Sequence, residues 1–278
     1  VFPLVIDNAK QLRNFVQIMR SGAIGRKSLG TSPKNMVKRW INNASVRQLI
    51  QASVGKDPSL ADILKMVHPT PASMPQNILF KWILGMDISE TEFSLLPREI
   101  QHLIAFRKGR VSDVPSVPFE LLTSCNLTKE NWASIAANGG WHMTRMNLNT
   151  FSRNGLFDNR EFVTMIANKL SNVQDIAKAK VFPYQIFTTW KFANSVPPEV
   201  LRALEYALEY SLQTVPSFNG KKVHIFVDVS GSMGSPITGT RPGATSAIRC
   251  TDVAALIASS FLRANPDNTN VVMFDTMI

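Results

Sequence analysis

The hydrophobic pattern of this chain changes near residue 216, and the change limits the folds that the chain can adopt. From Val1 to about Pro216, apolar residues recur at helical spacing in one short segment after another. Beyond a short linker, Val223–Val229 is an apolar run rich in β-branched residues that ends at serine and glycine. Such a run is typical of a strand buried on both faces of a parallel sheet. We therefore predict a mainly α-helical domain at residues 1–216 and the N-terminal part of an α/β domain at residues 221–278.

Apolar spacing, N-cap residues and prolines define the bounds of the expected helices. The helices expected in the first domain are Ala9–Arg20, Pro33–Asn42, Val46–Val54, Leu60–Val67, Gln76–Leu84, Glu92–Lys108, Phe119–Thr123, Lys129–Asn138, Trp141–Ser152, Glu161–Ser171, Pro183–Asn194 and Pro198–Thr214. In the second domain we expect a helix at Ser246–Leu262 and a second strand at Asn270–Phe274. Helix pairs that recur every 20–45 residues or so, without a strict sequence repeat, indicate a HEAT-like stack.

Composition excludes several classes of protein. Hydrophobic residues make up 45% of the 278 residues and charged residues 18%, which is typical of a globular protein and not of a disordered one. No apolar run approaches the roughly 20 residues of a membrane-spanning helix, so we expect no membrane association. The two cysteines, Cys125 and Cys250, fall in different predicted domains, and we expect a reducing, cytoplasmic compartment. Because the chain lacks an initiator methionine and ends inside a predicted sheet, we expect it to be a piece of a longer protein.

Positive charge is concentrated in the first part of the chain. Residues 1–110 contain 16 Lys and Arg against 7 Asp and Glu, whereas residues 223–278 contain 3 against 4. The expected helix Pro33–Asn42 has Lys34, Lys38 and Arg39 on its polar arc, and Arg26 and Lys27 precede it in a glycine-rich loop. We predict that these five side chains bind phosphates. An ordinary solvated helix face remains the alternative, although no acidic residue occurs between Asp7 and Asp57.

Three further residues are candidates for contact with nucleic acid. His68 precedes a proline at the end of an expected helix, where it is available to contact a base or a phosphate, or to have no such role. Arg145 and Arg153 lie among aromatic and methionine side chains, a combination that suits stacking on single-stranded bases. Aromatic residues at helical spacing also form cores, and that alternative stays open for this segment.

The end of the strand at Val223–Val229 contains a candidate metal site. Asp228, Ser230 and Ser232 follow the order D-x-S-x-S at the C-terminal end of a parallel strand, where open α/β sheets bind ligands. One carboxylate and two hydroxyls are hard oxygen ligands, suited to Mg²⁺ or Mn²⁺. We expect Gly231 and Gly234 to allow the tight turn that brings these side chains together. A strand-to-helix turn without metal is the alternative.

This loop resembles the metal-ion-dependent adhesion site of von Willebrand factor A domains. That resemblance implies an α/β, Rossmann-like domain whose metal site is completed by a threonine and an aspartate from later loops. Because the chain stops at Ile278, we expect cation binding to be weak or absent here.

The order of the helices and this loop is similar to that of the Ro ribonucleoprotein autoantigen family, a TROVE module followed by a von Willebrand A domain, in a bacterial-type or divergent form. The stretches that carry the resemblance are Gly25–Asn42, Leu60–Pro69, Leu121–Trp132, Met143–Gly155 and Lys221–Met233. The resemblance implies a HEAT-repeat ring, monomeric and without catalytic activity. It also implies Y-type RNA on a basic outer surface, single-stranded 3′ ends of misfolded RNA in a central hole, and a role in RNA quality control. For bacterial members it implies an exoribonuclease partner. The helix Lys34–Arg39 fits the outer surface, and Arg145 and Arg153 fit the hole.

Two other functional classes are distinct from RNA binding. In one, the A-type domain binds a partner protein through its metal and the helices serve as scaffold, but the positive charge lies far from the metal loop in sequence. The other is an enzyme. No nucleophile elbow, paired-carboxylate or metal-hydrolase signature occurs, so we expect no catalysis.

Overall fold

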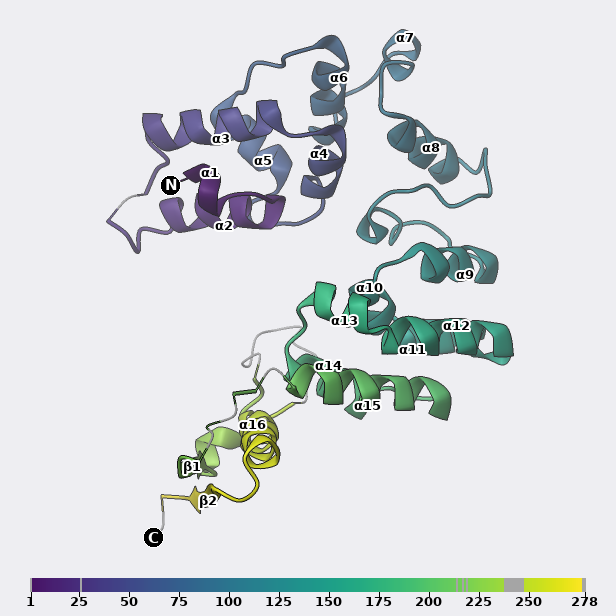
Figure 1. Ribbon diagram of the computed structural model, residues 1–278. Coiled ribbons are helices and arrows are strands. Elements are labelled where there is room, and N and C mark those ends of the chain that lie inside the picture. The colour runs from purple at the N-terminus through teal and green to yellow at the C-terminus, as the bar shows by residue number, and fades with distance from the viewer. Residues whose placement is uncertain are drawn as a thin grey trace. The chain divides into compact units, whose positions relative to one another are not determined.

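The computed structural model describes residues 2–25, 27–213, 215–216, 218, 220–237 and 248–276. Helices predominate, as predicted, and the chain divides into two compact units, Val1–Asn131 and Trp132–Ile278. Figure 1 labels the helices and strands of both units. No helix in the described ranges has the length and apolar character needed to cross a membrane.

The first unit is built from short helices around one hydrophobic core. Its elements are α1 (Phe2–Val5), α2 (Ala9–Arg20), α3 (Thr31–Asn43), α4 (Val46–Ala52), α5 (Leu60–Val67), α6 (Met74–Ile83), α7 (Glu90–Phe93), α8 (Arg98–Arg107), a 3₁₀ turn at Phe119–Leu121 and the start of α9 (Lys129–Asn138). Capping boxes define several of these starts, because an Asn or Ser side chain accepts from the third backbone N–H of the helix at Asn8, Ser45, Ser59 and Ser89. Val16, Val37 and Ile41 are fully buried, so α2 and α3 turn their apolar faces into the same core.

Two expected helices of the first unit have different bounds in the structure. Helix α3 begins at Thr31, after Gly30, and not at Pro33 as expected. Gly30 has a φ of 68°, a left-handed conformation that glycine adopts at little cost. The expected helix Glu92–Lys108 is split into α7 and α8, because Pro97 disfavours helical backbone at Leu96.

The second unit contains further helices and a small α/β part. Its elements after α9 are α10 (Trp141–Met146), α11 (Leu148–Arg153), a 3₁₀ turn at Leu156–Asp158, α12 (Arg160–Ser171), α13 (Val173–Ala179), α14 (Pro183–Lys191), α15 (Pro198–Leu212), β1 (Val223–Asp228), a 3₁₀ turn at Gly231–Gly234, α16 (Cys250–Ala264) and β2 (Thr269–Phe274). Helix α15 packs against α12, α13 and α14. Lys169 of α12 donates to two carbonyls near the end of α9, at 2.7 Å from Ala136 O and 2.8 Å from Ala137 O, and to Gly139 O just after this helix at 2.9 Å.

The expected helix Trp141–Ser152 is broken at Asn147. The Asn147 side chain donates to Met143 O at 2.9 Å, and its backbone N–H bonds to Thr144 O at 3.2 Å. A side-chain amide thus competes with the backbone for the carbonyl that a continuous helix would use. Helix α13 was not predicted, although Asn172 caps it by accepting from the backbone N–H of Asp175 at 3.0 Å.

Strands β1 and β2 pair in parallel, with Val223 opposite Thr269 and Asp228 opposite Phe274, and α16 connects them. The prediction that both faces of β1 are buried is wrong for the described residues. Val227 is 7% exposed, whereas the neighbouring Phe226 is 66% exposed. Exposure alternates because α16 packs against one face of the pair and no other described element covers the opposite face.

Ion pairs connect the helices and the α/β part within the second unit. Lys191 of α14 lies 3.1 Å from Asp252 of α16, and Arg263 of α16 makes two hydrogen bonds with Glu209 of α15, at 2.6 and 2.8 Å. The first two residues of the expected helix Ser246–Leu262 lie outside the described residues. The domain boundary that we predict between residues 216 and 221 stays a prediction. The boundary between the two compact units lies elsewhere, between Asn131 and Trp132.

Candidate functional site

Four of the five predicted phosphate-binding residues lie in the described part of the first unit. Lys27 is exposed in the loop between α2 and α3, Lys34 and Arg39 are exposed on α3, and Lys38 on α3 is half-buried. Arg26 lies outside the described residues. None of the ion pairs found among the described residues involves these four cations, which we call the α3 basic surface. Their charge is therefore available to an anionic ligand.

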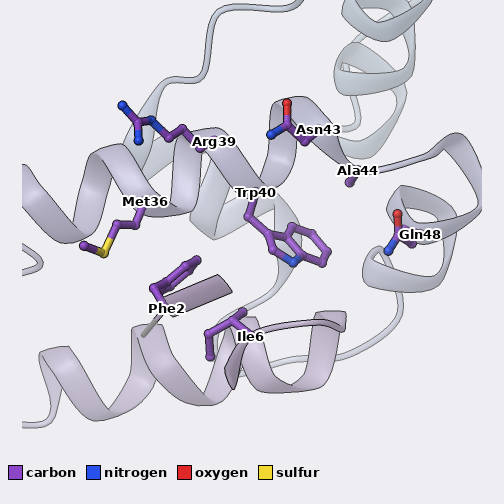
Figure 2. A pocket seen from close by; sticks show the side chains of 8 residues that line it. All are labelled: Phe2, Ile6, Met36, Arg39, Trp40, Asn43, Ala44 and Gln48. Carbon is purple, nitrogen blue, oxygen red and sulfur yellow. The ribbon is translucent and has the colours of Figure 1, made fainter. Parts of the chain in front are cut away.

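A cavity of about 400 Å³ lies beside the α3 basic surface. It is lined by Phe2, Ile6, Met36, Arg39, Trp40, Asn43, Ala44 and Gln48. Figure 2 shows Met36 and Trp40 extending from α3 toward Phe2 and Ile6 of the N-terminal segment. A second hollow, of about 380 Å³, is lined by Thr31, Ser32 and Asn35 and shares Met36 and Arg39 with the first. The two hollows follow one side of α3, and Arg39 borders both.

The cavity contains side chains that the sequence did not single out. Met36 is 39% exposed and lines the cavity, whereas Val37 and Ile41 of the same helix are fully buried. Phe2 and Gln48 come from α1 and α4. Residue spacing cannot predict that side chains from such separate elements line one cavity. The one signal of the cavity in the sequence was the adjacent arginine and tryptophan, Arg39 and Trp40, on α3.

His68 and Arg153 are both exposed, but they lie in different units. His68 is the left-handed C-cap of α5, and α5 ends at Val67 as the following proline predicted. Arg153 ends α11 and donates to Thr150 Oγ1 at 3.2 Å. Both side chains are accessible to a ligand from solvent.

Arg145 is buried, with 6% of its surface exposed. Its Nη1 donates to Gln185 O at 2.8 Å and to Thr189 Oγ1, both on α14. Burial lowers the pKa of its guanidinium, because desolvation disfavours the charged form. This placement favours the core interpretation over a base contact for Arg145, and the structure does not bring Arg145 and Arg153 into one site.

The structure brings the three predicted metal ligands together at the end of β1. Asp228 Oδ1 accepts from the backbone N–H of Ser230 at 2.9 Å, and the hydroxyls of Ser230 and Ser232 are 3.2 Å apart. Adjacent ligands of an octahedral Mg²⁺ are about 3.0 Å apart, given Mg–O distances of about 2.1 Å. Hydrogen bonds from the side chain and then the backbone of Ser230 lower the pKa of Asp228, so the carboxylate is ionised at neutral pH.

This donor set fits a hard divalent cation. No group of three His, Cys, Asp or Glu side chains gathers among the described residues, so a cation at this loop would depend on one carboxylate and two hydroxyls. The reason given for the glycines is wrong, because neither Gly231 nor Gly234 has a positive φ. The loop turns as a 3₁₀ helix with ordinary backbone angles.

Comparisons with known proteins identify the fold. No protein-family model matches this sequence, and no curated protein matches it. Among solved structures, the crystal structure of the Deinococcus radiodurans Ro (RSR) protein is similar, with a TM-score of 0.62 and 20% sequence identity. The match covers 98% of this chain and 57% of the Ro chain, so this chain spans little more than half the length of that protein. The chain therefore has a Ro-type fold, with a helical-repeat part followed by an α/β part.

Proposed function

We propose that this chain is a non-catalytic RNA-binding protein that binds small structured RNA through the α3 basic surface. The observation that carries the proposal is the charge of the segment from residue 8 to residue 56, which contains ten basic residues and no acidic one. Uncompensated positive charge repels itself, and a polyanion removes that repulsion while releasing its own counterions. The Ro-type fold supports the same proposal.

The geometry of α3 supports phosphate contacts more than base readout. Lys34 and Lys38 are four residues apart on one helix, so their side chains are neighbours, and Arg39 continues the charge toward the cavity. Lys27 enters from the loop before α3. Lysine and arginine side chains on a helix surface contact the phosphates of a nucleic acid. Such contacts fix the orientation of the nucleic acid and carry little sequence information.

We extend the proposal to Y-type RNA on this surface and to single-stranded RNA ends at a second place in the chain. Arg153 is an exposed candidate for contact with the single strand. His68, in the first unit, is an exposed candidate for contact with a base or a phosphate. A role in cytoplasmic RNA quality control follows from this pair of ligands. It is supported by the likeness of motif order stated above.

Replacing Lys34, Lys38 and Arg39 together by glutamine tests the proposal. Each lost phosphate contact lowers the slope of log K against log salt by roughly 0.7 to 0.9, so the triple variant should flatten the slope by about two units. The melting temperature should change little, because all three side chains reach solvent. Binding of a labelled RNA hairpin is measured between about 50 and 200 mM salt.

A matched control removes the same number of charges elsewhere. Arg202, Lys221 and Lys222 are exposed in the second unit, and their triple glutamine variant should keep the wild-type slope. Unchanged affinity and slope in the α3 variant would contradict the proposal and leave these residues as an ordinary solvated helix face.

A second candidate function is metal-dependent binding of a partner protein. The specific observation in its favour is that Asp228 accepts from the backbone N–H of Ser230 at 2.9 Å while the hydroxyls of Ser230 and Ser232 lie 3.2 Å apart. A cation held there keeps open positions that a partner's carboxylate can fill. Partner binding that is abolished by a chelator and is insensitive to the α3 substitutions would favour this function over RNA binding.

A further inference from the structure

The cavity beside α3 has walls suited to a flat, aromatic ligand. Trp40 and Phe2 contribute rings, and Met36 contributes a polarisable thioether. The Phe2 ring is fixed in place by Phe15 of α2, at 5.0 Å between centroids and 79° between planes. The volume of about 400 Å³ falls within the range of about 300–1,000 Å³ that is usual for small-molecule sites.

The polar side chains of the cavity are mainly hydrogen-bond donors. Gln48 Oε1 already accepts from the backbone N–H of Ser45 at 2.8 Å and lies 3.0 Å from Ser45 Oγ, so its amide offers N–H groups. Arg39 has donors only. Neither Arg39 nor Asn43 makes a side-chain hydrogen bond to any residue that the structure describes. No acidic residue lines the cavity.

Arg39 relates this cavity to the α3 basic surface, because it belongs to both. We infer that the cavity binds one unpaired nucleobase of the RNA whose phosphates contact Lys34 and Lys38. The inference rests on the proposed function, and it adds a base-binding subsite to a surface that otherwise contacts only the backbone. A base in the cavity stacks on the aromatic side chains, and the edge of the base accepts hydrogen bonds from the donors.

The donor-rich edge selects among bases. Guanine presents two acceptors, O6 and N7, on the edge that arginine contacts in bidentate fashion. Adenine presents one acceptor and one donor on the same edge, and the donor would face Arg39 without a partner. We therefore assign the cavity a preference for guanine over adenine.

The test compares an RNA hairpin with a blunt end to the same hairpin with a 3′ flank of two guanosines or two adenosines. Base stacking on an aromatic side chain corresponds to roughly 5- to 150-fold in affinity. The wild-type protein should bind the guanosine-flanked hairpin tighter than the blunt one by a factor in this range. The adenosine flank should give a smaller gain. Affinity is measured by fluorescence anisotropy at fixed salt concentration.

Two variants alter the cavity and keep every cation of the α3 basic surface. Ala44→Leu fills the cavity, and Trp40→Leu removes the stacking ring. Both should lose the preference for the flanked hairpin and keep the affinity and salt slope for the blunt one. Ala44→Leu keeps the test valid if Trp40→Leu fails to fold, since Trp40 packs against the core. Val46→Leu, at an exposed position of α4 outside the cavity lining, is the control and should behave as wild type.

The outcomes separate the two proposals. Equal wild-type affinity for blunt and flanked hairpins, with a steep salt slope, would overturn the base-binding inference and leave the proposed function standing. No binding of any hairpin at low salt would overturn the proposed function itself. Two further results would overturn the assignment of the cavity to RNA. One is GMP binding as tightly as the flanked hairpin, and the other is an acidic peptide displacing the flank without displacing the stem.

Discussion

Arg145 is a buried cation whose hydrogen bonds join two helices of the second unit. It lies on α10 and donates to Gln185 and Thr189 of α14, while its Nε has no partner among the described residues. A buried charge without a carboxylate partner is costly, and it is retained here with two acceptors that a smaller side chain could not reach. The side chain therefore serves packing between α10 and α14.

Substituting Arg145 by alanine should destabilise the protein. The change leaves a cavity and removes the donors of two α14 acceptors, so the free energy of unfolding should fall by about 2–4 kcal/mol. Arg153→Ala removes only one exposed hydrogen bond and should change it by less than about 0.5 kcal/mol. Urea denaturation of both variants checks this. Equal stability of the two variants would return Arg145 to the list of ligand-binding candidates.

Asp228 should be the dominant cation ligand of the loop after β1, because it supplies the negative charge and the serines supply neutral oxygens. Calorimetry with Mg²⁺ and Mn²⁺ should show weak binding to this chain, with Kd on the order of 1 mM, and none to Asp228→Ala. Ser232→Ala, which keeps the charge, should weaken binding without abolishing it. Heats that are the same for the wild type and Asp228→Ala would exclude this loop as a cation site.

At the scale of single elements, the N-terminus of α16 is capped by a carboxylate, that of Asp252, whose protonation depends on pH. Asp252 accepts from the backbone N–H of Arg249 at 2.9 Å and pairs with Lys191 of α14 at 3.1 Å. The Arg249 backbone N–H, and then Lys191, lower the pKa of Asp252 below its ordinary value of 3.8. A carboxyl group whose pKa is lowered on folding stabilises the fold above its unfolded pKa, and the stabilisation is lost as the pH falls through the folded pKa.

The Asp252→Asn variant should therefore melt below the wild type at pH 7, by the equivalent of less than about 1 kcal/mol, since the pair is partly exposed. The difference should shrink as the pH falls below about 4 and vanish once Asp252 is protonated in the folded protein. Thermal melts from pH 7 down to pH 2 measure it. A difference that stays constant across this range would show that packing, and not ionisation, causes the loss.

Elements with their own end signals were predictable, and elements that depend on distant partners were not. Helices α2, α5 and α9 have the predicted bounds, because caps, prolines or glycines mark their ends locally. The break at Asn147 depends on a side-chain rotamer that no spacing reveals. For β1, the strand was correctly predicted, but its burial depends on which elements pack against it, and a β-branched run carries no such information.

The same limit applies to the candidate sites. The positions of charged residues can be read directly from the sequence, so helical spacing was enough to place Lys34, Lys38 and Arg39 on one polar arc. The order D-x-S-x-S likewise placed Asp228, Ser230 and Ser232 in one loop, and cation binding by this loop stays a prediction. The α3 cavity could not be predicted, because its walls come from three helices and the connecting segments, and close only when the first unit packs.

For the whole molecule, the two compact units differ in charge. Residues 1–131 carry 17 Lys and Arg against 10 Asp and Glu, and residues 132–278 carry 13 against 10. The first unit contains the α3 basic surface and its cavity, and the second contains the loop of Asp228, Ser230 and Ser232. The RNA-binding and metal-dependent hypotheses can therefore be tested on separate units of the full chain by substitution alone.

The uneven charge also gives this protein an unusual digestion pattern. Between Asp7 and Asp57 the chain offers no cleavage site to a protease that cuts after acidic residues, yet it offers ten basic residues to trypsin. Lys27 lies in an exposed loop, where trypsin cuts folded proteins most readily. An RNA seated on α3 would slow tryptic cleavage in that loop and leave the acid-specific digest of the rest of the chain as an internal reference. Limited proteolysis with the two proteases can therefore map where RNA binds without any added label.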